Sequence, residues 1–382
     1  MTVVVAVYTL VNYYIFIRAL QAFPSGSVIR IWFIAAFWML VSAFVLARIL
    51  ERAHPCHFTE ALTWIGNFWL AFMLFFFIAV LMLDIIRFFE HFFHFLPNAW
   101  MVNYLLTKQV TFVLTVILVS ITVTAGYINA RNPRVKELFL EINKPGHGRS
   151  ELTIAMASDI HLGTIIRKAK ARELVKMLNA PKPDLILLAG DIVDEDLAPV
   201  IRDNIGDALC GLKAGIGVFA ITGNHEYIGG AGPAVDYLEK HGIRMLRDTA
   251  ILVNDQFYLT GREDRDKPRF SGKPRKELSE IMKDVDLSYP VILMDHQPFN
   301  LGTAASLGVD LQLSGHTHHG QIWPFNYITR AIYEVSWGYK KIGNTHFYVS
   351  CGFGTWGPPV RLGNRPEVVI IHLRFRDGQN KS

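Results

Sequence analysis

Residues 151–161 read ELTIAMASDIH, an apolar run that predicts a buried strand and ends in Asp159 and His161. The same pattern, a short apolar run followed by small or polar residues, recurs at Leu185–Ala189, Val218–Ile221, Val291–Met294 and Leu311–Leu313. Helical stretches separate several of these runs, at Ala169–Leu178, Val200–Leu212 and Ala234–His241. Strands that alternate with helices at this spacing predict an α/β sheet covered by helices.

Side chains able to bind a metal follow all five predicted strands. They are Asp159 and His161, Asp191 after Gly190, Asn224 to Glu226 after Gly223, His296, and His316 and His318 after Gly315. In an α/β sheet such strand ends meet at one edge, where ligands bind. A single group of this kind is more often a turn or a cap, but buried polar groups at five strand ends need partners, and metal ions supply them. Carboxylate, imidazole and amide donors without thiolates suit Mn, Fe, Zn or Co, and this number of donors favours two ions that share a carboxylate.

The C-terminal part of the chain has a different pattern. Residues Lys340–Ser350 predict a hairpin that turns at Gly343 and Asn344, and Glu367–Phe375 predicts a final strand. This part therefore predicts a second sheet that is more antiparallel than the first.

The polar groups, taken in order over Leu152 to Phe375, resemble the motifs of the calcineurin-like metallophosphoesterases. The resemblance implies a two-sheet α/β/β/α sandwich with two divalent metal ions at one edge; Mn²⁺ is expected, with Fe, Zn, Co or Mg as alternatives. Matched to the family motifs, the ligands of one ion are Asp159, His161, Asp191 and His318, and those of the other are Asp191, Asn224, His296 and His316. Asp191 is the shared ligand, and His225 is the histidine that contacts the phosphate or protonates the leaving oxygen.

This assignment implies hydrolysis in which a hydroxide bridging the two metals attacks phosphorus. Two cations lower the pKa of a shared water and neutralise the charge that develops on the phosphoryl oxygens. Among the motif residues, His225 is the candidate acid that the ligand assignment leaves free. Asp194, three residues after Asp191, either orients His225 or caps a loop.

Two further segments are similar to the membrane-associated subgroup of this superfamily. They are Gly315–Pro324, which reads GHTHHGQIWP, and Cys351–Arg361, which reads CGFGTWGPPVR. His319 departs from the glycine often found there, and it is either an extra phosphate contact or a bystander at the rim. Arg361 and Arg365 are candidate phosphate contacts, with surface arginines as the alternative.

The N-terminal third has the composition of a membrane segment. Residues 1–130 hold six of the 38 Lys and Arg residues and four of the 33 Asp and Glu residues. Apolar stretches near Thr2–Leu20, Val28–Leu50, Trp64–Ile86 and Leu105–Ala130 approach the roughly 20 residues that cross a bilayer. We therefore predict an α-helical membrane domain of about four spans over 1–130, a linker over 131–150, the metallophosphoesterase domain over 151–376 and a tail over 377–382.

The charges near the predicted spans bear on topology and on the bilayer surface. Arg131, Arg134, Lys136 and Lys144 follow the fourth span and place the C-terminal domain in the cytoplasm. Asp84, Arg87 and the segment Phe88–Leu96 form either an intramembrane polar site or an amphipathic interfacial stretch. The basic segment Gly261–Lys276 either meets anionic headgroups or is a solvated loop, and the apolar segment Trp323–Trp337 either covers a lipid tail or covers the core.

These observations predict a membrane-anchored phosphohydrolase that cleaves a phosphodiester or pyrophosphate in a lipid-linked or membrane-proximal substrate. Alternatives are a step like that of UDP-diacylglucosamine pyrophosphohydrolase in lipid A synthesis, a phosphoprotein phosphatase, and a non-enzymatic membrane sensor. The expected partners are the phosphorylated substrate and the lipid bilayer. Nucleic acid is not expected, because the net charge is only +5 and no basic stripe alternates with aromatic residues. Three widely spaced cysteines predict neither a disulfide framework nor a zinc site.

Overall fold

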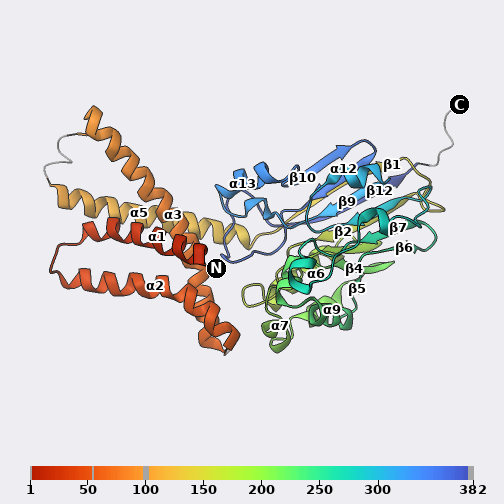
Figure 1. The fold of residues 1–382 in the computed structure, drawn as a ribbon, viewed down its shortest axis with the longest axis horizontal. Coiled ribbons are helices and arrows are strands. Elements are labelled where there is room, and N and C mark those ends of the chain that lie inside the picture. Colours follow the sequence, from red (N-terminus) through yellow and green to blue (C-terminus); the bar gives the residue numbers. More distant parts are fainter. Residues whose placement is uncertain (1, 54–55, 98–102, 377–382) are drawn as a thin grey trace. The chain divides into compact units, whose positions relative to one another are not determined.

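The chain forms two compact units, shown as a ribbon in Figure 1. The computed structural model describes residues 2–53, 56–97 and 103–376. The helical unit comprises residues 1–128 with 357–360, and the sheet unit comprises 129–356 with 361–382. The predicted tail, 377–382, lies outside the described residues.

Four long helices make up most of the described part of the helical unit. They are α1 (Thr2–Ala19), α2 (Val28–Ala53), α3 (His57–Phe93) and α5 (Tyr104–Ala130), and the short helix η1 (Leu20–Ala22) follows α1. Among the described residues, these four are long and apolar enough to cross a membrane. α3 has 37 residues and includes most of the segment 88–96, for which the sequence left an intramembrane polar site and an interfacial stretch as alternatives.

A buried polar contact joins helices inside the helical unit. Asn12 on α1 is fully buried, and its Oδ1 accepts a hydrogen bond of 3.0 Å from the Trp69 indole on α3. Its amide nitrogen donates to the Tyr8 carbonyl, which satisfies the group locally. A polar residue whose hydrogen bonds are satisfied in this way fixes how α1 packs on α3.

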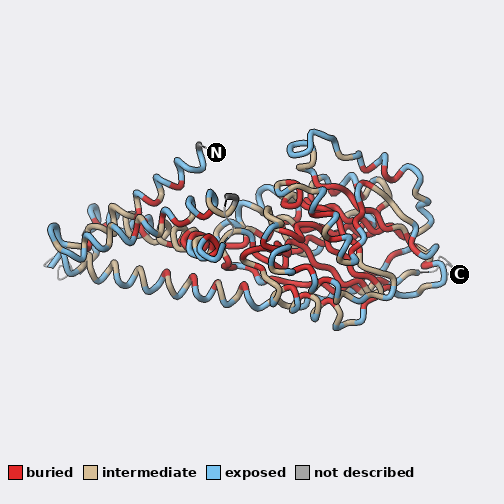
Figure 2. Tube along the Cα trace, turned by 90° about the horizontal axis from the view of Figure 1, so that it is seen from below, coloured by how far each residue is buried: buried red, intermediate tan, exposed pale blue. Residues whose placement is uncertain are grey.

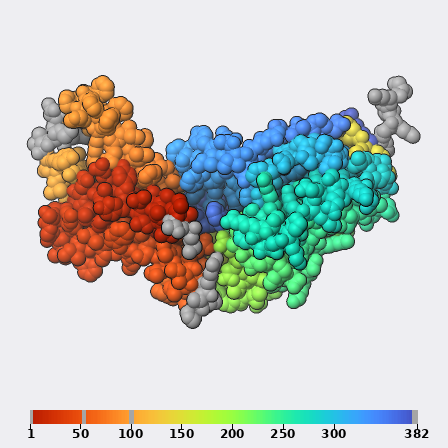
Figure 3. Space-filling model, in the orientation of Figure 1, coloured from red at the N-terminus to blue at the C-terminus, as the bar shows by residue number. Residues whose placement is uncertain are grey.

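The first sheet of the sheet unit has the strand order β1-β12-β2-β3-β4-β5. Its strands are β1 (Arg134–Ile142), β2 (Glu151–Ala157), β3 (Leu185–Ala189), β4 (Gly217–Ile221), β5 (Arg244–Met245) and β12 (Glu367–Phe375). β1 lies inside the predicted linker 131–150 and pairs in parallel with β12; Figure 3 shows its yellow surface beside the blue C-terminal residues. β12 in turn runs antiparallel to β2, so the last strand belongs to this sheet and not to the second one as predicted.

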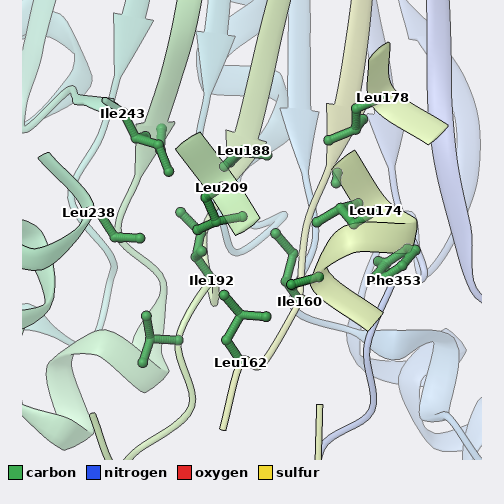
Figure 4. Packing of buried hydrophobic residues seen from close by; sticks show 14 of the residues in the cluster. Ile160, Leu162, Leu174, Leu178, Leu188, Ile192, Leu209, Leu238, Ile243 and Phe353 are labelled. Atoms are coloured by element: carbon green, nitrogen blue, oxygen red, sulfur yellow. The ribbon is translucent and has the colours of Figure 1, made fainter. Parts of the chain in front are cut away.

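Helices cover the outer face of the first sheet. They include α6 (Lys168–Asn179), α7 (Ala198–Arg202), η2 (Gly206–Gly211), α8 (Asn224–Gly229) and α9 (Ala231–Lys240). Figure 4 shows the apolar side chains that fill this layer, among them Leu174, Leu188 and Ile192. The single helix predicted over 200–212 is wrong: Asn204, at a φ of 47°, separates α7 from η2. Gly206 then lies so close to the Tyr237 ring that a side chain there would collide with it.

The second sheet has the order β10-β11-β9-β8-β7-β6. Its strands are β6 (Thr249–Val253), β7 (Phe257–Gly261), β8 (Val291–Met294), β9 (Leu311–Ser314), β10 (Gly338–Ile342) and β11 (Thr345–Val349). The hairpin of β10 and β11 turns at Gly343 and Asn344 as predicted. The three central pairings are parallel and the two outer pairings are antiparallel, so the sheet is mixed.

A second apolar layer lies between the two sheets, with Met156, Leu187, Leu259 and Leu313 among its fully buried members. Short helices accompany the second sheet: α10 (Lys267–Ser271), α11 (Leu278–Ile281), α12 (Leu301–Ser306), η3 (His318–Gly320) and α13 (Phe325–Ile332). Figure 2 shows buried residues concentrated inside the sheet unit, whereas the long helices carry mainly intermediate and exposed residues with scattered buried ones. The predicted two-sheet α/β sandwich is confirmed, and both sheets send parallel strands toward one edge.

Candidate metal centre

The predicted metal ligands follow the carboxyl ends of strands in both sheets. Asp159 and His161 follow β2, Asp191 follows β3, Asn224 opens α8 after β4, His296 follows β8, and His316 and His318 follow β9. Five of these residues have a left-handed backbone: Asp159, His161, Asp191, His316 and His318, with φ between 46° and 70°. Strained backbone of this kind persists only where the surrounding structure holds it, and it concentrates at functional sites.

The donor atoms form three overlapping groups: Asp159, His161 and His318; His161, Asp191 and His225; and Asp191, His296 and His316. In the first, His161 Nε2 lies 3.0 Å from His318 Nε2, and His318 Nε2 lies 3.5 Å from Asp159 Oδ1. In the third, His296 Nε2 lies 3.1 Å from Asp191 Oδ2, and His316 completes the group. Within each group all ligand atoms lie within 4.8 Å of one another.

The fourth predicted member of the third group is an amide. Asn224 Oδ1 lies 2.8 Å from His316 Nδ1. The structure therefore brings together all seven predicted ligands, including the amide and imidazole donors of a mixed site.

The arrangement of these side chains fits divalent metal ions. His296 Nδ1 donates a hydrogen bond of 2.7 Å to the Ala189 carbonyl, which leaves Nε2 as the ring nitrogen that faces Asp191. That buried Nε2 has no hydrogen-bond partner among the described residues. Burial lowers the pKa of His316 to about 3 and holds the pKa of His318 well below its usual range, so both imidazoles are neutral, the form that binds metal.

Glu226 anchors the loops that carry two of the predicted ligands, a role that its local sequence did not indicate. Its carboxylate accepts hydrogen bonds from the backbone N–H groups of Asp191, Ile192, Val193 and Gly223, at 2.7–3.1 Å. Gly223 packs against Asp191, and a side chain there would collide with the carboxylate. The only signal in the sequence was the acidic residue directly after Asn224 and His225.

His225 belongs to the second group and is held by Asp194. Its Nδ1 lies 3.0 Å from Asp194 Oδ1, and its backbone N–H donates to Asp191 Oδ1 at 2.9 Å. Asp194 Oδ1 also accepts a hydrogen bond from the Glu195 N–H at 3.0 Å. Asp194 therefore makes the contacts of both interpretations, the one that orients His225 and the one that caps a loop. Burial favours a neutral His225, but Asp191 and Asp194 outweigh it and raise its pKa to about 9. The protonated ring can donate a proton.

Arg361 is placed differently from the predicted phosphate contact. It is fully buried and donates to the carbonyls of Cys351 at 2.7 Å and Gly354 at 2.6 Å, while its Nη2 lies 3.1 Å from His318 Nδ1. The prediction of a substrate contact is wrong for this residue, because none of its surface is open to a ligand. Arg361 instead packs behind His318 and holds that ring in place.

His319 and Arg365 also have structural partners. His319 is buried, and its Nδ1 lies 2.8 Å from Ser336 Oγ, which donates to Thr329 Oγ1 on α13 at 2.9 Å. His319 therefore ties the metal-binding loop to α13, and its predicted place at the rim is wrong because the ring is enclosed. Arg365 is exposed and donates to the Asn132 carbonyl at 2.6 Å.

Aromatic residues flank the clusters. Trp356, half of whose surface is exposed, lies edge-on to His225 with ring centroids 5.8 Å apart. Tyr333, at the end of α13, lies 6.0 Å from the His316 ring and 4.8 Å from Phe299. Arg265, from the basic segment Gly261–Lys276, lies over the ring of Phe299. Its guanidinium carbon is 4.2 Å from the ring centroid. The site thus has apolar and cationic surface close to the metal ligands.

Comparison with known proteins identifies the family. The family model for calcineurin-like phosphoesterases matches residues 152–320. An uncharacterized metallophosphoesterase of Aquifex aeolicus is 36% identical over 243 residues, which cover 63% of this chain and 92% of the relative. The chain belongs to the calcineurin-like phosphoesterase family.

Other similarities add context to this phosphoesterase. A bovine protein described as a transmembrane protein with metallophosphoesterase domain is 29% identical over 281 residues, covering 68% of this chain and 62% of the relative. Among solved structures, a 5′-nucleotidase precursor from Thermus thermophilus is 14% identical, with a TM-score of 0.37, covering 59% of this chain and 54% of that one. The family and the clustered ligands make the chain a metal-dependent phosphoester hydrolase.

Proposed function

We propose that this chain is a membrane-anchored phosphohydrolase that uses two divalent ions, with Mn²⁺ preferred, to cleave a phosphodiester or pyrophosphate. Its substrate is lipid-linked or lies at the membrane surface. The observation that supports a lipid-linked substrate is the exposed apolar surface of α13, directly next to the metal ligands in sequence and tied to them through His319.

The residues of the site divide the chemistry between them. Asp159, His161, Asp191 and His318 would hold one ion, and Asp191, Asn224, His296 and His316 would hold the other. When bound, the ions supply Lewis-acid polarisation of the phosphoryl group and lower the pKa of water. His225 delivers a proton to the leaving oxygen, and Asp194 keeps the ring oriented for that transfer.

The apolar surface of α13 fits the tail of an amphipathic substrate. The exposed apolar side chains in and beside this helix are Trp323, Phe325, Tyr327, Ile328 and Ile332. Ile328 and Ile332 are four residues apart and therefore share one face of the helix. An exposed apolar patch next to a polar site is typical of a surface that contacts lipid or another apolar ligand.

The proposed anchoring rests on the four apolar helices. The proposed side of the membrane for the catalytic domain rests on the basic residues that follow α5. Arg131, Arg134, Lys136 and Lys144 follow α5, and positive residues next to a span favour the cytoplasmic side. We therefore propose a multi-pass protein whose catalytic domain is cytoplasmic.

The test compares two substrates with the same purified, Mn²⁺-loaded full chain. One is the soluble diester bis-p-nitrophenyl phosphate, and the other is a lipid-linked pyrophosphate in mixed micelles. We expect turnover of the lipid substrate, and its loss in Asp191→Asn and His225→Ala. Turnover of the soluble diester alone would retain the metal chemistry and refute the lipid-linked substrate.

The double variant Ile328→Ser/Ile332→Ser isolates the role of α13. Both side chains are exposed, so the change does not open a cavity in the core. We expect a higher KM for the micellar substrate and unchanged turnover of the soluble diester. Equal KM values for wild type and variant would show that α13 does not bind the lipid.

A further inference from the structure

The helical unit contains a cavity of about 240 Å³ between its helices. Its apolar lining includes Ile15, Phe37, Trp69, Phe76, Val80 and Phe112, from α1, α2, α3 and α5. The volume exceeds the roughly 150 Å³ of an apolar protein cavity that accommodates benzene. The cavity can therefore hold part of an acyl chain.

One end of this cavity is charged. Along α3 the lining runs from Trp69 through Phe76 and Val80 to Asp84 and Arg87. Arg18, from the last turn of α1, and Lys108, from the second turn of α5, line the same cavity. Because the helices cross several apolar turns before reaching these residues, the cavity has an apolar interior and a polar end.

The charges at the polar end do not balance. Asp84 accepts a hydrogen bond of 2.6 Å from the Tyr14 hydroxyl and pairs with Arg18 at 2.8 Å and Arg87 at 3.4 Å. Lys108 lies over the Tyr104 ring, 4.1 Å from its centroid. Of the lining residues that the structure describes, three are cationic and one is a carboxylate, so the end carries a net charge of +2. The buried Arg18 Nε also has no hydrogen-bond partner within residues 2–53, 56–97 and 103–376.

We propose that this cavity binds one anionic phospholipid, with an acyl chain among the aromatic residues and its phosphate against Arg87, Lys108 and Arg18. Uncompensated charge near a bilayer is costly, and a phosphate supplies the missing negative charge. A neutral lipid would fill the apolar part and leave the net charge of +2 at the polar end uncompensated. This site is separate from the phosphoester chemistry, so it stands or falls independently of the proposed function.

The test measures which lipid stays with the purified full chain. The protein is mixed in detergent with equal amounts of phosphatidylglycerol and phosphatidylcholine that carry the same acyl chains, and bound lipid is counted by native mass spectrometry. We expect one retained phosphatidylglycerol, with roughly tenfold preference over phosphatidylcholine. The double variant Arg87→Gln/Lys108→Gln should bind both lipids equally.

Two more variants separate the cavity from general surface charge. Ala36→Phe places a ring into the cavity from α2 and should abolish the retained lipid. Arg48→Gln removes a cation of α2 that does not line the cavity and should leave the preference intact. Circular dichroism and turnover of the soluble diester check that each variant is folded. Equal preference in wild type and Arg87→Gln/Lys108→Gln, or equal binding of both lipids by wild type, would overturn the proposal.

Discussion

The two sheets of the sheet unit contribute different chemistry to one site. The first sheet supplies both carboxylate ligands, Asp159 and Asp191, from the ends of β2 and β3. The second supplies only imidazoles, His296, His316 and His318. The negative charge of the donor clusters therefore comes from the first sheet, and the second sheet contributes the imidazole nitrogens that would complete the donor sets.

The ligands of the two sheets are also held in different ways. Glu226 anchors the Asp191 loop through backbone N–H groups that all belong to the first sheet's loops. By contrast, His296 is oriented by the Ala189 carbonyl of β3, and the His316 N–H donates to Asp159 at 2.8 Å. The second sheet's ligands thus depend on the first sheet for their orientation, so damage to the first sheet should have the wider effect.

The largest expected effect compares Asp191, which we propose binds both ions, with His296, which we propose binds only one. Asp191→Asn should reduce bound metal at both positions and lower turnover by about 10³-fold, because several kcal/mol of charge stabilisation are lost. His296→Ala should remove only one ion per chain. Metal content by plasma mass spectrometry, together with diester turnover, checks both variants. Retention of the same metal stoichiometry in both would contradict the shared role of Asp191.

The next effect tests the anchor of the first sheet. Glu226→Ala leaves four buried N–H groups without their acceptor, which should cost about 3 kcal/mol or more of stability. Glu226→Gln keeps one acceptor oxygen and should lose roughly half as much. Thermal unfolding at a fixed scan rate should give Tm values that fall from wild type to Glu226→Gln and then to Glu226→Ala. Equal Tm values for all three proteins would show that the loops hold their shape without Glu226.

A smaller effect is expected where the segment between β11 and β12 supports a ligand of the second sheet. Arg361→Met removes the group behind His318 and should weaken metal binding by about 10–100-fold, as loss of an outer-shell partner does. Arg365→Met, a change four residues away at an exposed arginine, is the matched control and should not alter affinity. Competition with a chelating dye gives both dissociation constants.

The smallest effect concerns the pH dependence of stability. Burial raises the pKa of the Asp264 carboxyl to about 7. A raised carboxyl pKa means that the folded state binds the proton more tightly, so this stability is present below the unfolded value near 4 and disappears as pH rises through 7. Asp264→Asn should raise Tm by a few degrees at pH 8 and change it little at pH 5. An identical shift at the two pH values would rule out titration as the cause.

Much of the site followed from local sequence. Each ligand stands at the end of an apolar run, and the carboxyl ends of parallel strands meet at one edge whatever the loops between them do. The four apolar helices could be predicted from the sequence equally well, since length and hydropathy alone define them. The strand β1 was missed because its residues Arg134–Ile142 are mostly exposed and interleaved with charges, so they lack the apolar run of a buried strand.

The sequence by itself determined which residues gather into the donor clusters, because strand periodicity brings Asp159, Asp191 and His316 to one edge. Only the tertiary structure decided what supports them. Arg361 became a buried partner of His318, and His319 a link to α13, through contacts with Gly354 and Ser336 that are remote in the chain or depend on loop shape. A buried polar side chain takes its role from the partners that folding brings within hydrogen-bond distance, and local sequence does not encode those partners.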